Sequence, residues 1–135
     1  MKKAIQTEKS WNLVDAKGKI LGRLASYVAK MLSGKNSVSY ARNLDRGDFV
    51  VIINAKNIIA SGKKETQKNY FRHSGYPGGL KSKTTAQIRA KSPETLIRHA
   101  VVGMLPKNRL GKEMARKLFV YSDSTHPYQE KFKSN

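Results

Sequence analysis

Two Ser-Gly-Lys triplets are the residues in this sequence that come nearest to a nucleotide-phosphate loop. They are Ser33–Lys35 and Ser61–Lys63. Such a loop needs a glycine five residues before the second glycine, and a Ser or Thr after the lysine, to hold phosphate and Mg²⁺. Ala29 and Asn57 stand where that glycine is required, and neither lysine is followed by Ser or Thr. The triplets are therefore predicted to be a helix end and a turn.

Histidines and carboxylates, which bind metals and move protons, are scattered along the chain. The histidines are His73, His99 and His126, and none has a second ligand at metal-site spacing. Asp45 and Asp48 flank Gly47, a pattern typical of a turn with Arg46 as its local partner. The chain has no cysteine, and no nucleophile, base and orienting residue can be grouped. We expect no catalytic residue, no metal and no cofactor, and we do not expect an enzyme.

The excess of cations is the feature that calls for a partner. The chain has 27 Lys+Arg against 9 Asp+Glu, a formal net charge of +18 in 135 residues. Self-repulsion at this charge destabilises a compact chain, and a polyanion removes it. A membrane is the weaker candidate, because the longest unbroken apolar run, Phe49–Ile53, is far shorter than the roughly 20 residues of a spanning helix. Nucleic acid is therefore the predicted partner, with no membrane contact.

Two segments concentrate these cations. In residues 61–85, lysines and arginines alternate with aromatic residues around Gly75–Gly79, a mixture that neutralises phosphates, stacks on bases and lets backbone amides approach. Arg109, Lys112 and Arg116 recur at helical spacing and form a basic stripe after Pro106. We predict that both segments bind nucleic acid. A merely solvated basic surface is the alternative for each.

The apolar pattern indicates which elements position these segments. Strands are predicted at residues 11–14, 49–53, 58–60 and 119–121, and two extended arms at residues 68–73 and 80–84. Helices are predicted from Leu21 to Gly34, from Pro93 (capped by Ser92) to Pro106, and after a cap at Asn108, with Leu110, Met114 and Leu118 on the apolar side. The run at residues 49–53 does not alternate, which predicts a strand covered on both faces. This order favours an α/β fold around a small, mostly parallel sheet. We expect a single domain over residues 1–121 and a short C-terminal tail over residues 122–135.

Four blocks of the sequence resemble the thirteenth protein family of the large ribosomal subunit, and they keep that family's order. The blocks are Trp11–Ala25, Gly47–Ala55, Tyr70–Lys81 and Gly103–Leu118. The last two are the most specific, and together the blocks cover nearly the whole chain. The sequence departs from the family at Ala41-Arg42-Asn43, where Thr-Pro-His is common, and after His126-Pro127.

The resemblance implies a three-layer α/β/α domain around the sheet, with a basic Gly-rich loop. It also implies a structural role: binding large-subunit ribosomal RNA, early subunit assembly and packing beside other large-subunit proteins. A single copy per particle is expected, with no homo-oligomer and no small-molecule substrate, in the cytoplasm or in an organelle matrix or stroma. From charge pattern and resemblance together, the expected RNA-binding residues are Arg23, Lys63, Lys64, Lys68, Arg72, His73, Tyr76, Gly78, Gly79, Lys81, Lys83, Lys107, Arg109, Lys112, Arg116 and Lys117.

Two other functions stay open at this point. One is a basic chromosome-associated regulator, although no dimerisation surface or long arm is visible in the sequence. The other is an enzyme acting on RNA, which the missing acid–base set disfavours. Helix-turn-helix, zinc-finger and RNP signatures are absent, so motifs do not separate RNA from DNA.

Overall fold

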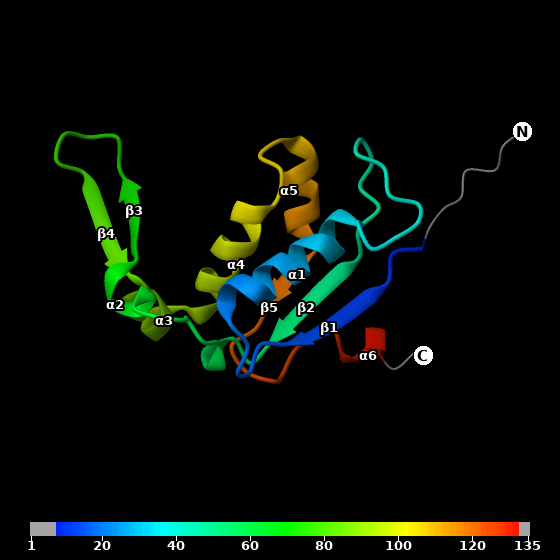
Figure 1. Ribbon diagram of the computed structural model, residues 1–135, viewed down its shortest axis with the longest axis horizontal. Helices are drawn as coiled ribbons and strands as arrows, with labels where there is room; N and C mark the ends of the chain where they lie inside the picture. The colour runs from blue at the N-terminus through cyan, green and yellow to red at the C-terminus, as the bar shows by residue number, and fades with distance from the viewer. Residues whose placement is uncertain (1–7, 133–135) are drawn as a thin grey trace, which may run out of the picture.

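A three-stranded parallel sheet forms the centre of the protein in the computed structural model, which describes residues 8–132 (Figure 1). Its strands are β1 (Trp11–Asp15), β2 (Phe49–Ile53) and β5 (Leu118–Val120), in the order β1-β2-β5. The longer helices α1 (Leu21–Ser33), α4 (Pro93–Met104) and α5 (Arg109–Arg116) lie together on one face of the sheet. The expected α/β fold around a small, mostly parallel sheet is confirmed.

The central strand β2 shows why its sequence does not alternate. Val50 and Ile52 point into the main core among α1 and α4, and both are fully buried. Val51 is also fully buried but faces the other side. There Trp11 stacks on Phe49, with ring centroids 4.5 Å apart. The strand is therefore covered on both faces, as its sequence predicts.

The segment after β5 supplies this second cover. It includes the single-turn helix α6 (Gln129–Phe132), which lies on the sheet face opposite α1 (Figure 1). The Tyr128 ring lies 5.0 Å from Trp11 and 4.6 Å from Phe119, measured between centroids. Helical elements therefore flank the sheet on both sides, although the second layer is thin. The division at residue 121 stays a prediction, and residues 1–7 and 133–135 lie outside the described part.

An antiparallel hairpin projects from one end of this body (Figure 1). It consists of β3 (Asn69–His73) and β4 (Leu80–Thr84), and it confirms the two predicted arms. The short helices α2 (Lys64–Gln67) and α3 (Thr85–Lys91) form its base. The hairpin pairs with no strand of the central sheet.

The helix ends show which of the predicted caps are formed. α1 ends at Gly34, which takes the left-handed conformation with φ 78° and ends the helix as predicted. α4 begins at Pro93, but the Ser92 side chain makes no capping hydrogen bond. The capping box in the described chain is at α3 instead. There Thr84 Oγ1 accepts a hydrogen bond from the Gln87 N–H, and Gln87 Oε1 accepts one from the Thr84 N–H.

Two strand predictions need correction. Residues 58–60 form no strand; Ile59 makes only an isolated bridge to Ile20, after the short 3-10 helix η1 (Ala55–Asn57). The last strand begins at Leu118, one residue earlier than predicted, because α5 ends at Arg116. Leu118 is therefore a buried strand residue and does not belong to the apolar side of α5. Within the described part of the chain, the helices are too short or too polar to cross a membrane.

Candidate nucleic-acid interface

One face of the hairpin gathers cations from both strands. Residues directly opposite in an antiparallel pair lie on the same face, as do residues two apart. Arg72 is opposite Lys81 and Tyr70 is opposite Lys83, so these four side chains share a face. The three cations are exposed, whereas Tyr70 is half-buried against the core. Like charges directly opposite each other are destabilising, so the Arg72–Lys81 pair favours an anion between them.

The opposite face and the tip of the hairpin expose apolar and aromatic surface. The exposed fractions are 67% for Phe71, 76% for Tyr76 and 61% for Leu80. A hairpin of two strands is marginally stable in water without a covered apolar face. These side chains therefore provide area for contact with a partner, and Tyr76 has an accessible ring for stacking.

Glycines and one histidine shape the turn that joins the two strands. Gly78 has φ 70°, which favours glycine, and a Cβ at Gly79 would collide with Ser74 Oγ and approach the Tyr76 carbonyl. His73 Nδ1 accepts a hydrogen bond of 2.9 Å from the Gly75 N–H, which leaves Nε2 free for another partner. The turn therefore needs Gly79 for its own geometry, whether or not the backbone there contacts a phosphate.

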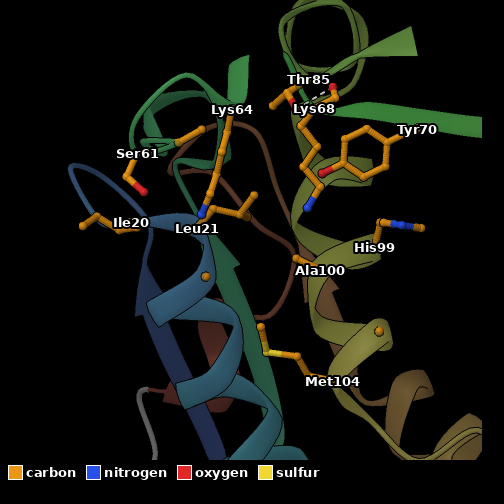
Figure 2. A pocket seen from close by; sticks show the side chains of 13 residues that line it. Ile20, Leu21, Ser61, Lys64, Lys68, Tyr70, Thr85, His99, Ala100 and Met104 are labelled. Carbon is orange, nitrogen blue, oxygen red and sulfur yellow. Dashed lines mark hydrogen bonds between the residues drawn. The ribbon is translucent and has the colours of Figure 1, made fainter. Parts of the chain in front are cut away.

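The base of the hairpin carries three more predicted residues. Lys63 and Lys64 are exposed at the start of α2, and Lys68 joins α2 to β3. The Lys68 carbonyl accepts a 3.2 Å hydrogen bond from the Thr85 N–H, which fixes it to the buried start of α3. Lys64 and Lys68 extend into a pocket between α1 and α4 (Figure 2).

The second basic segment is the exposed side of α5. Asn108 Oδ1 accepts a 2.8 Å hydrogen bond from the Gly111 N–H, so the predicted cap begins the helix. Arg109, Lys112 and Arg116 are exposed, and Arg116 forms a 2.8 Å exposed ion pair with Glu113. The cationic stripe therefore exists, with one of its members paired locally.

Two predicted residues lie outside these segments. Lys107 is exposed in the turn before α5. Arg23 is exposed in the first turns of α1, where it lines a shallow hollow with Lys19 and Tyr27. The hairpin and α5 stand apart, with α4 between them (Figure 1). The predicted residues therefore form separate surfaces and not one continuous patch.

Lys117 is expected among the RNA-binding residues, but its side chain lies inside the protein. Its side chain is 5% exposed, and its Nζ donates to the carbonyls of Leu32 and Gly47 at 3.2 and 2.8 Å. The same Nζ lies 2.5 Å from an oxygen of Asp45. Because α5 ends at Arg116, the next residue turns inward instead of continuing the exposed stripe. Lys117 therefore joins the end of α1 to the 35–48 loop.

This internal site shifts the pKa of both charged partners. Burial lowers the pKa of the Lys117 ammonium below its ordinary value, although Asp45 opposes the change. Burial favours the protonated form of Asp45, but the bonds from Lys117 and Lys9 outweigh it, so the pKa of Asp45 lies below its ordinary value. Lys9 Nζ lies 3.0 Å from the second Asp45 oxygen. Both ammonium groups therefore have a counter-charge within the chain, the shared Asp45 carboxylate.

The expected local pairing of Arg46 with its neighbouring carboxylates is wrong. Arg46 donates to the Ser39 carbonyl at 2.8 Å. Asp48 accepts from the Ser10 N–H and Oγ, each at 3.1 Å. Both carboxylates anchor distant segments, which a pattern of neighbouring residues does not reveal. Among residues 8–132, no group of three or more His, Asp or Glu side chains is placed to hold a metal ion.

The structure adds three cations that the sequence pattern did not single out. Lys30, Lys35 and Arg42 line a hollow of about 440 Å³ between α1 and the start of α5. They come from the end of α1 and the following loop, and the α5 side chains that line the same hollow are Leu110 and Met114. Only the fold brings them together. The position of Lys30 on the polar side of α1 was the one signal available in the sequence.

Comparison with known proteins gives the family. The family model described as "Ribosomal protein L13" matches residues 9–127. The "Large ribosomal subunit protein uL13" of Dictyoglomus thermophilum is 53% identical over 129 residues, covering 96% of this chain and 91% of that protein. The protein of the same name from Nostoc sp. is 54% identical, covering 90% and 80%, and that from Staphylococcus aureus is 50% identical, covering 90% and 83%. With this fold, this charge and these matches, the chain belongs to the ribosomal protein L13 family.

Proposed function

We propose that the chain is a structural, non-enzymatic constituent of the large ribosomal subunit that binds large-subunit ribosomal RNA. The β3–β4 hairpin makes the principal contact, with its base at α2. The exposed side of α5 makes a second contact. In this role the protein holds RNA through phosphates and shape and takes part in early assembly of the subunit.

The observation that carries this proposal is the lack of counter-charge on the hairpin. No Asp or Glu stands between Glu65 and Glu94 in the sequence, and Glu65 is paired with Arg89 at the hairpin base. Arg72 and Lys81 are nevertheless placed opposite each other in adjacent strands. Such an arrangement opposes folding in isolation and becomes favourable when phosphates lie between the side chains.

The exposed rings support RNA over double-stranded DNA. Tyr76 at the tip of the projecting hairpin and Phe71 on one face of it are more than half exposed. Unpaired bases of an RNA loop stack on such rings, whereas the bases of a DNA duplex are stacked on one another. The Arg23 and Lys107 side chains add phosphate contacts at the edges of the two surfaces.

Partners and location follow from the proposed role. The neighbours are other proteins of the large subunit, and one copy is present in each particle. The site of action is the ribosome, in the cytoplasm. An organelle ribosome is the alternative location.

A salt series tests the proposal. With a transcript of the large-subunit RNA, log K is expected to fall against log[salt] with a slope of about −4 to −5 if about six phosphates are neutralised. Sedimentation of a lysate should place the chain with the large subunit at low and moderate salt. A slope near zero, or a chain that stays at the top of the gradient, would contradict the proposal.

A further inference from the structure

The pocket at the base of the hairpin is shaped for more than a phosphate. It has a volume of about 390 Å³ and lies between α1, α2, the start of β3 and α4 (Figure 2). Part of its lining is apolar and includes Ala60, Ala100 and Met104, and Met104 remains 49% exposed. Apolar side chains do not stabilise a bare anion, but a planar organic ring that buries its surface against them binds more favourably.

The rim of the pocket is cationic and lacks acid. Lys64 and Lys68 extend into it, and no Asp or Glu belongs to its lining (Figure 2). Within residues 8–132, neither ammonium forms an ion pair with a carboxylate. The Lys68 Nζ instead lies 5.3 Å from the centre of the Tyr70 ring. The charge of the pocket therefore complements an anion from outside the chain.

Two rings form one wall beside these lysines. The centroids of Tyr70 and His99 are 5.0 Å apart, with an angle of 81° between the ring planes. Tyr70 shares its hairpin face with Arg72 and Lys83, so the cationic face of the hairpin leads into this wall. An RNA strand that follows the hairpin therefore reaches the pocket.

Two helical glycines keep the pocket open. A Cβ at Gly22 of α1 or at Gly103 of α4 would meet no atom within 4 Å, so the chain's own packing does not require glycine there. Both residues line the pocket. Because glycine is a poor helix former, larger residues at these sites would favour the helices while reducing the space between them.

We propose that this pocket takes one unstacked nucleotide of the bound RNA, an inference that rests on the proposed function. The base packs on the apolar part of the lining, which includes Ala60, Ala100 and Met104, and against Tyr70 and His99. Lys64 and Lys68 hold the adjoining phosphate. Recognition of this kind is how single-stranded RNA loops and bulges are bound.

The test fills the pocket without changing its charge. In Gly103→Leu the new side chain occupies the pocket, and in the control Val102→Leu the added bulk lies outside its lining. Loss of one stacked base weakens binding of the large-subunit RNA transcript about 5- to 150-fold. Gly103→Leu should show this loss with an unchanged or higher thermal midpoint, and Val102→Leu should bind like the unmodified chain.

Crosslinking identifies the occupant. A transcript containing 4-thiouridine, irradiated in the complex, should crosslink at Tyr70 or His99, and Gly103→Leu should abolish that crosslink. The variant Arg72→Gln/Lys81→Gln is measured in parallel. If it loses RNA affinity while Gly103→Leu keeps normal RNA affinity, the pocket proposal is overturned and the proposed function stands. Loss of incorporation into the subunit with normal RNA affinity would assign the pocket to a neighbouring protein. Displacement of the RNA crosslink by free uridine monophosphate at low concentration would make it a small-molecule site, and either result overturns the proposal.

Discussion

Lysines gather in two regions of this protein, the junction around Lys117 and the β3–β4 hairpin, but their surroundings are opposite. At the junction, Lys117 and Lys9 face the two oxygens of Asp45, and two backbone carbonyls complete the set. On the hairpin, Arg72 faces Lys81 and no carboxylate lies in the segment. The same residue type therefore serves folding in one region and, in the proposed function, an external partner in the other. What distinguishes the two is whether the chain supplies the counter-charge.

The largest expected effect is at the junction. Lys117→Ala removes the donor to the carbonyls of Leu32 and Gly47 and one of the two donors to Asp45, which keeps Lys9, and breaking such a buried pair costs about 3–5 kcal/mol of unfolding free energy. Chemical denaturation measures the loss, with the exposed Lys112→Ala as control, expected within about 0.5 kcal/mol of the unmodified chain. RNA affinity of the folded Lys117→Ala fraction should be unchanged. Weaker RNA binding with normal stability would place Lys117 at the RNA interface, and the Lys117 site would then not differ from the hairpin in function.

The second largest effect is expected on the hairpin, where substitutions should weaken RNA binding without lowering stability. Replacing Arg72, Lys81 and Lys83 with Gln should weaken RNA binding by about 3 kcal/mol at moderate salt, and the salt slope should become shallower by about 2–3. Removal of the Arg72–Lys81 repulsion leaves the thermal midpoint unchanged or raises it slightly.

The matched control removes three exposed lysines elsewhere. In Lys17→Gln/Lys56→Gln/Lys131→Gln, the same charge is lost from the turn after β1, from η1 and from α6. Filter binding across a salt series compares the two triple variants. Equal losses of affinity would mean that only total charge matters and that the hairpin is not a specific surface.

A smaller effect is expected at α5. Lys112→Ala with Arg116→Ala should weaken RNA binding by about 1–3 kcal/mol through lost phosphate contacts. The unfolding free energy should change by less than about 0.5 kcal/mol, because the Arg116–Glu113 pair is exposed. Glu113→Ala is the control on the same helix and should bind RNA at least as well as the unmodified chain. A double variant that melts early and binds normally would assign these side chains to folding, as for Lys117.

The smallest effect is a dependence of stability on pH at the junction. The pKa of Asp45 in the folded protein lies below its ordinary value of 3.8, so its contribution is present above that value and is lost as the pH falls through the folded pKa. The difference in unfolding free energy between the unmodified chain and Asp45→Asn should therefore shrink between pH 6 and about pH 3. A difference that stays constant over this range would mean that the Asp45 carboxylate is not held by Lys117 and Lys9.

Local signals in the sequence predicted much of the fold, and distant contacts were beyond them. Gly34, Pro93 and Asn108 mark helix ends because each acts within one turn of its own position. The Thr84–Gln87 capping box obeys the same local rule, since a Thr followed three residues later by Gln is typical of a helix start. Asp45 stands 72 residues from Lys117, so no spacing rule connects them.

The candidate site also has a part that local sequence predicts and a part that only the fold brings together. The hairpin pairs residues that are close in sequence, and its cationic composition therefore predicted a cationic surface. Lys117 differs from Arg116 only by lying one residue beyond the end of α5, and helix ends are the least certain part of any sequence-based prediction. The pocket with Lys64, Lys68 and His99 joins three separated segments, and the fold alone reveals it.

The aromatic cover of the sheet has a consequence for the order of events during synthesis. Trp11 is made long before its stacking partners Phe119 and Tyr128. The edge strand β5 also follows β2 at a distance, so the body closes only after residues up to Tyr128 have emerged, and such distant contacts form slowly. The hairpin is complete once residue 84 has emerged, since all its pairs lie within residues 69–84. A nascent chain therefore presents its cationic arm before its body closes, and the fluorescence of the single tryptophan reports the moment of closure.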